Sequence, residues 1–131
     1  MSDDTRPLHN FQILRTGDLD EARRAVADVY LEHRLDSAQS DRLDMTLNAI
    51  EERLFTAGYL AYGAEATLEM PPTEVNYHVN LTTGGSTNAV RSDGIRATTE
   101  AGRSGLILHP NQTTKVDWAS DAEQFILKVP R

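Results

Sequence analysis

The sequence predicts one mainly β domain, a sandwich or barrel of short strands preceded by one amphipathic helix. Three observations lead to this fold class. Apolar residues recur at helical spacing within residues 18–33. From about residue 42 the apolar period changes to two, and turn residues interrupt the chain at intervals of about 8 to 12 residues. The length of 131 residues is close to the commonest size of a single domain with its own core.

Composition narrows the class of protein further. With 39% hydrophobic and 25% charged residues, the chain has the make-up of a soluble globular domain. It has no cysteine, which excludes disulfides, thiolate nucleophiles and zinc sites built on sulfur. The net charge of −7 disfavours direct binding of nucleic acid or of an anionic membrane. An acidic, polar N-terminus is unlike a signal peptide, and together with the lack of a long apolar run it predicts a cytoplasmic protein without a membrane span.

The helical part begins after a flexible arm, which we expect over residues 1–15. Asp18 can accept a hydrogen bond from the Glu21 amide, an arrangement typical of a helix start, and we expect the helix to extend over residues 18–33. One apolar stripe recurs along this segment: Leu19, Ala22, Val26, Val29 and Tyr30. This helix should pack its apolar side on the β part.

We expect the β part, a barrel, over residues 42–130. Its first segment, residues 42–57, fits a helix and a strand, because apolar residues occur at both spacings. We favour a strand to about residue 50, followed by a turn near Glu51 to Arg53. The Asp93-Gly94 pair predicts a type I′ hairpin turn, which needs two residues that tolerate positive φ.

Two later strands are marked by alternation, in "YHVNLTT" and "EQFILKV". The stretch "GLILHPNQTTKVDW" reads as two strands joined at a corner that contains His109 and Pro110. Alternation leaves open which face of each strand points inward.

Few residues suggest catalysis. His78 and His109 are the histidines of the β part and could meet inside a barrel to hold a metal ion. Metal sites usually have three or four ligands at recognisable spacing, so we favour structural roles for both. The chain also lacks the Gly-x-Ser-x-Gly elbow of serine hydrolases and the lysine of a phosphate-binding loop. We therefore expect no cofactor, no metal and no enzymatic activity.

Binding fits the sequence better, because aromatic and polar side chains gather in the β part. A small-molecule pocket is usually lined by rings and a few convergent polar groups. In such a pocket the rings would stack on the ligand, and Asn80 or Arg96 would bind its polar end, with arginine best suited to a carboxylate. The predicted ligand-binding residues are Tyr59, Tyr62, Tyr77, His78, Asn80, Arg96 and Trp118.

The order of several segments is recognisable. "DLDEARRAVADVYLEHRLD", "LAYGAEATLEMPP", "YHVNLTTGGS", "GRSGLILHPNQTTKVDW" and "FILKVPR" follow one another as in a known family. From about Phe11 to Arg131 the chain resembles the N-terminal effector-binding domain of AraC/XylS-family transcription regulators, more narrowly the AraC-binding-like subgroup. The resemblance implies a cupin-like double-stranded β-helix, a jelly-roll barrel that binds a small effector, with an arm that can fold over the occupied pocket.

It also implies how such a domain would act. The effector, for which an aromatic or short-chain acid is one candidate, would change how an attached helix-turn-helix domain engages DNA in a bacterial regulator that can form homodimers. No helix-turn-helix module is present in these 131 residues, so we expect an excised sensor domain more than a natural stand-alone protein. Two other classes stay open: a small cupin enzyme with a metal bound through His78 and His109, and a dimerisation module.

Overall fold

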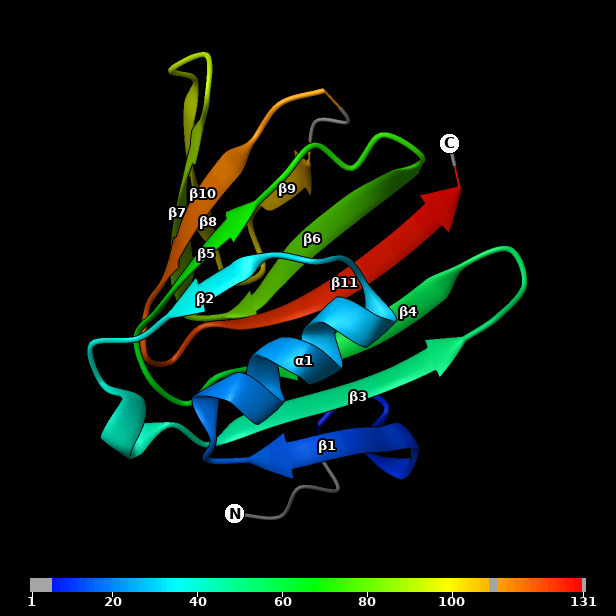
Figure 1. Ribbon diagram of the computed structural model, residues 1–131, viewed down its shortest axis with the longest axis vertical. Coiled ribbons are helices and arrows are strands. Elements are labelled where there is room, and N and C mark those ends of the chain that lie inside the picture. Colours follow the sequence, from blue (N-terminus) through cyan, green and yellow to red (C-terminus); the bar gives the residue numbers. More distant parts are fainter. Residues whose placement is uncertain (1–5, 109–110, 131) are drawn as a thin grey trace.

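The fold consists of two antiparallel sheets and one α-helix (Figure 1). It is seen in a computed structural model, which describes residues 6–108 and 111–130. The strands of the six-stranded sheet, in spatial order, are β1 (Gln12–Thr16), β3 (Met45–Glu51), β4 (Thr56–Ala61), β11 (Glu123–Pro130), β6 (Asn76–Gly84) and β9 (Gly105–Leu108). Those of the five-stranded sheet are β2 (Arg34–Asp36), β5 (Ala66–Met70), β10 (Thr114–Trp118), β7 (Ser86–Arg91) and β8 (Arg96–Glu100). The predicted mainly β fold class is confirmed.

The expected closed barrel is replaced by a sandwich with one open side. No strand of one sheet pairs with a strand of the other among the described residues. On one side the sheets approach each other, because β8 contacts β6 and β9. On the other side the helix α1 (Leu19–Val29) contacts β1 and β3 of one sheet and β2 of the other, and it lies in front of the gap in Figure 1. The helix thus covers the side that strand pairing leaves open.

Local interactions explain where α1 begins and ends. The Asp18 carboxylate accepts a hydrogen bond from the Glu21 amide at 2.8 Å, the predicted N-cap. The helix ends at Val29, earlier than the predicted residue 33. There the Lys128 ammonium donates to the Val29 carbonyl at 2.7 Å, so a distant strand satisfies a carbonyl at the helix end. The sequence of the helix itself contains no sign of this long-range cap.

The segment expected as a flexible arm contains a strand. β1 pairs with β3 over Gln12–Thr16, because β3 would otherwise be an unpaired sheet edge. Before it, the Arg6 guanidinium donates to the Thr46 hydroxyl at 2.7 Å, and the Asn48 amide donates to the Pro7 carbonyl at 3.1 Å. The described part of the arm therefore lies against the outer face of the six-stranded sheet and does not cover the space between the sheets.

Both predicted turns occur, one in a different geometry. β3 extends to Glu51 and a turn follows, as expected. β7 and β8 form the predicted hairpin, but only Gly94 has positive φ, at 90°. The Gly94 amide donates to the Arg91 carbonyl, and the Asp93 carboxylate accepts from the Ile95 amide and pairs with Arg91 at 2.6 Å. A type I turn followed by one left-handed glycine replaces type I′ because the loop is longer than two residues.

Candidate functional site

A small cavity lies between the sheets, at the end of α1. Its volume is about 20 Å³, enough for about one water molecule. Most lining side chains are aliphatic or aromatic, and the polar ones come from β6 and from the segment that follows α1. The cavity is lined by Val26, Tyr30, Leu31, His33, Leu60, Leu68, Met70, His78, Asn80, Leu108, Trp118 and Ile126.

His78 is the central polar residue of this cavity. It comes from the inward face of β6, its side chain is buried, and neither ring nitrogen has a hydrogen-bond partner among the residues that the structure describes. Burial, with a further contribution from the Lys128 charge, lowers the pKa of His78 to about 4, while the nearby Tyr30 carbonyl acts weakly in the opposite direction. His78 is therefore neutral at physiological pH, with one donor and one acceptor nitrogen available.

Asn80 lies two residues further along β6 and faces the same way. Its amide nitrogen donates to the Gln124 side-chain oxygen at 3.0 Å, which fixes the orientation of the amide group. Its oxygen is buried and has no hydrogen-bond partner within residues 6–108 and 111–130. Gln124 in turn contacts the Thr82 hydroxyl at 3.5 Å, and Thr82 is hydrogen-bonded at 2.6 Å to Thr99 of the opposite sheet. A buried polar network thus holds Asn80 in place and links the two sheets.

His33 approaches the cavity from the segment between α1 and β2. Its Nδ1 lies 3.0 Å from the Leu31 carbonyl oxygen, so Nδ1 carries the proton and Nε2 is an acceptor. Nε2 is buried, and no described residue forms a hydrogen bond with it. Burial lowers the pKa of His33 as well. The cavity therefore holds two neutral imidazoles.

Trp118 and Tyr62 form an aromatic pair at the edge of the cavity. Their rings meet edge to face, with centroids 5.0 Å apart and planes inclined by 78°. Trp118 lines the cavity, and Tyr62 supports it from behind. The Tyr62 hydroxyl is buried without a hydrogen-bond partner in the described part of the chain, and burial raises the pKa of this phenol.

The structure brings only part of the predicted site together. His78, Asn80 and Trp118 line the cavity, and Tyr62 packs on Trp118. Tyr59 lies on the outer face of the six-stranded sheet, where Arg6 covers its ring and its hydroxyl donates to the Glu123 carboxylate.

Tyr77 and Arg96 also lie outside the cavity. Tyr77 precedes the inward His78 in β6 and so faces outward, with 38% of its surface exposed. Arg96 pairs with Val90 on the outer face of the five-stranded sheet and is exposed. Arg96 is therefore not placed to bind the carboxylate of a ligand in this cavity, contrary to what the sequence had predicted.

Sequence reasoning missed Tyr30 and His33. Tyr30 stood in the apolar stripe of the helix, which signals packing but not a place beside His78. His33 had no recognisable partner in the sequence, because its hydrogen bond is to a local carbonyl. His109, the predicted partner of His78 in a metal site, lies outside the described residues. Within residues 6–108 and 111–130, no three potential metal-ligating side chains converge.

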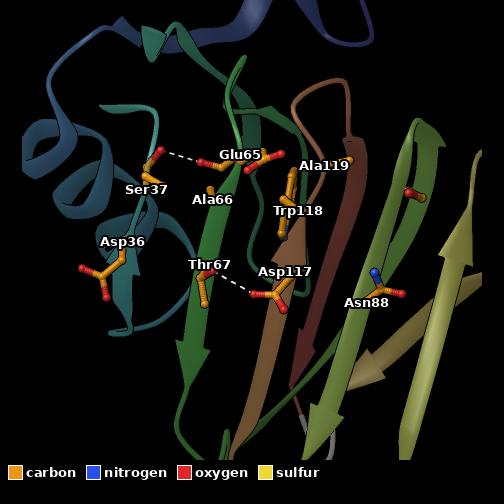
Figure 2. Close-up of a pocket in the computed structure, with 11 residues that line it drawn as sticks. Asp36, Ser37, Glu65, Ala66, Thr67, Asn88, Asp117, Trp118 and Ala119 are labelled. Atoms are coloured by element: carbon orange, nitrogen blue, oxygen red, sulfur yellow. Dashed lines mark hydrogen bonds between the residues drawn. The ribbon is translucent and has the colours of Figure 1, made fainter. Parts of the chain in front are cut away.

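A second, larger hollow lies on the outer face of the five-stranded sheet (Figure 2). Its volume is about 490 Å³, and its lining includes the carboxylates of Asp36, Glu65 and Asp117. The polar groups here are open to solvent or already bonded, as the Thr67 hydroxyl is to Asp117 at 2.8 Å. The inner cavity is the stronger candidate site because four of its polar atoms, on His33, His78 and Asn80, are buried and have no hydrogen-bond partner among the described residues.

A two-sheet β fold closed by a helix, with a polar cluster between its sheets, is the architecture of a cupin-like domain. The chain belongs to the AraC-binding-like domain family, whose sequence profile matches residues 22–131. Among solved structures, the AraC-like transcriptional activator CuxR superposes with a TM-score of 0.71 at 14% identity, over 91% of this chain and 47% of that one. The chain thus spans about half the length of CuxR.

Other similar structures are cupins of different kinds. The cupin domain of Schizosaccharomyces pombe Cnp3 has a TM-score of 0.53 at 14% identity, covering 75% of this chain and 69% of that one. KdgF from Halomonas sp. has a TM-score of 0.54 at 11% identity, covering 75% and 86%. At these identities the likeness concerns the fold. No curated protein sequence matches the chain. No helix in the described part of the chain is long and apolar enough to cross a membrane.

Proposed function

We propose that this domain binds a small organic effector between its two sheets and thereby controls an attached DNA-binding domain of an AraC-type transcription regulator. The observation that carries the proposal is the group of unpaired polar atoms around the inner cavity: His33 Nε2, both ring nitrogens of His78 and Asn80 Oδ1. A buried polar atom without a partner costs about 1–3 kcal/mol, so such atoms rarely gather around one cavity without a reason. An effector that bonds to them would recover this free energy.

The cavity must enlarge to receive an effector, because about 20 Å³ holds little more than one water molecule. Tyr30 is the side chain best placed to move. It follows the last helical residue, and it is held by one hydrogen bond, from its hydroxyl to the Ile126 carbonyl at 3.2 Å. If the effector takes its place beside His78, the end of α1 must shift. Effector binding would then change the surface of the domain, as control of an attached domain requires.

A regulatory role also fits the chemistry of the cavity better than catalysis does. Proton transfer at physiological pH needs a group whose pKa lies near 7, whereas burial holds His78 at about 4. In the described part of the chain, no carboxylate lines the cavity to activate either imidazole. The competing class is a small metal-dependent cupin enzyme. Stoichiometric metal in the purified protein, lost on His78→Ala or His109→Ala, would support that class against our proposal.

Ligand-induced stabilisation tests the proposed site. We expect a metabolite screen to find a compound that raises the melting temperature of the wild type and loses this effect in His78→Ala and Asn80→Ala. Asn88→Ala is the matched control, because Asn88 is an exposed amide on the outer face of the five-stranded sheet. If no compound stabilises the wild type, or if the cavity variants respond as the control does, the proposal fails.

A further inference from the structure

We propose that the effector is a neutral molecule with several hydroxyl groups on a compact apolar frame, bound by the acceptors of His33, His78 and Asn80. This inference rests on the proposed function, because it specifies the ligand of the same cavity. It follows from two properties of the lining: its lack of charge and its excess of hydrogen-bond acceptors.

The described part of the lining carries no charge that could pair with an ionised ligand. Among residues 6–108 and 111–130, none of the side chains around the cavity is a carboxylate, an ammonium or a guanidinium. The nearest inward cation, Lys128, is already bonded to the Val29 carbonyl and lies 6.0 Å from the centre of the Tyr30 ring. Moving an unpaired carboxylate or ammonium from water into such surroundings is strongly unfavourable. An acid or an amine is therefore a poor occupant.

The unpaired polar atoms are mostly acceptors. His33 Nε2 accepts because Nδ1 is bonded to the Leu31 carbonyl, and Asn80 Oδ1 accepts because its amide nitrogen is bonded to Gln124. The neutral His78 ring adds one acceptor and one donor. A ligand that satisfies this set must donate to as many as three acceptors while remaining neutral. Hydroxyl groups meet both conditions, because each supplies a donor without a charge.

The remaining walls favour a ligand with apolar faces. Aliphatic side chains from both sheets surround the polar atoms, and the Trp118 ring forms one side. Such walls suit the C–H face of a sugar or cyclic polyol, or the ring of a dihydroxybenzene. The aliphatic lining residues are Val26, Leu31, Leu60, Leu68, Met70, Leu108 and Ile126.

Calorimetric titration of matched neutral and charged probes tests the inference. The neutral probes are pentoses, hexoses, inositol, xylitol and catechol; the charged ones are aldonates, benzoate and amino sugars. We expect one or more neutral probes to bind the wild type and the corresponding charged probes to bind at least tenfold more weakly. Asn80→Leu should weaken the neutral probe about tenfold, the usual effect of losing one buried hydrogen bond, while Asn88→Ala should leave it unchanged.

A second measurement uses only the wild-type protein, so it does not require that a variant folds. In the wild type, the imidazole ¹⁵N shifts of His33 and His78 should change when the neutral probe binds. If a charged probe binds in an Asn80-dependent way and the neutral probes do not, the ligand class is wrong although the proposed function stands. If no probe and no metabolite of a broader screen binds, the proposed function fails. Binding that leaves the imidazole shifts unchanged overturns the inferred contacts.

Discussion

The Tyr30 ring meets the His78 imidazole edge to face, with the centroids 6.2 Å apart and the ring planes inclined by 63°. Tyr30 follows the last residue of α1, whereas His78 stands on the inward face of β6. This contact joins the helix that covers the open side of the sandwich to the polar centre of the cavity. Replacing the ring with an effector would therefore alter the position of the helix end.

Removing the Tyr30 ring should create a site for a molecule of the same shape. We expect Tyr30→Ala to lower the free energy of unfolding by about 3–5 kcal/mol, the usual cost of deleting a buried aromatic side chain. p-Cresol has the size and the hydroxyl of the lost side chain, so it should raise the melting temperature of Tyr30→Ala and leave the wild type unchanged. Differential scanning fluorimetry measures both effects.

Tyr30→Phe is the control, because it keeps the ring and loses the bond to the Ile126 carbonyl. It should cost about 1 kcal/mol and show no response to p-cresol. An equal response of Tyr30→Ala and Tyr30→Phe would show that p-cresol binds elsewhere.

The Tyr30 ring packs closely against Gly58 of β4. A Cβ atom at this position of β4 would lie 2.1 Å from the Tyr30 hydroxyl oxygen and 2.8 Å from the Asn48 carbonyl oxygen. We expect Gly58→Ala to push the ring aside and to destabilise the domain by about 1–3 kcal/mol. Combined with Tyr30→Ala, its additional cost should be smaller than in the wild type, because the shorter of the two contacts is gone and only the contact with the Asn48 carbonyl remains. Strict additivity in urea unfolding would contradict this placement of the ring.

Stability should fall with acidification between pH 6.5 and about 4. In the folded protein the pKa of His78 is held near 4, mainly by burial, whereas in the unfolded chain the imidazole binds a proton near 6.5. The unfolded state thus binds more protons in this window, so its free energy falls relative to that of the folded state as the pH decreases. The stabilisation is fully present above pH 6.5, and His78 alone accounts for a loss of about 3 kcal/mol by pH 4.

The contributions of other titratable groups to the pH dependence of stability can be distinguished from that of His78. The pKa of His33 is also lowered, so it adds in the same direction. The lowered carboxyl pKa values of Asp44 and Asp93, each paired with an arginine, act below about pH 4. Urea unfolding at several pH values should show a smaller slope between pH 6.5 and 4 for His78→Leu than for the wild type. Equal slopes would mean that His78 is not buried as a neutral ring.

Local patterns predicted much of the fold. The Asp18 cap, the strand ending near residue 50 and the hairpin at Gly94 are all determined by residues close in sequence. Contacts between distant segments determined the rest. β1 forms because β3 has a free edge, and α1 ends where Lys128 reaches Val29. No local pattern contains these long-range partners.

In the candidate site too, local sequence patterns predicted some features, and contacts between distant segments determined the others. Alternation in β6 placed His78 and Asn80 on one face and Tyr77 on the other, but it could not show which face points inward. For this reason Arg96 was wrongly expected to point into the pocket. It faces solvent on the outer side of β8. Tyr30 lies in the site because α1 packs against the six-stranded sheet. Helical periodicity alone does not specify against which sheet the helix packs.

The most direct test of an effector site between the two sheets is a crystal structure of the domain with a ligand found in the stabilisation screen. We predict that the ligand lies between the sheets, hydrogen-bonded to His78 and Asn80, with the Tyr30 ring displaced from Gly58. A ligand bound in the outer acidic hollow, with Tyr30 still against His78, would contradict an effector site between the sheets.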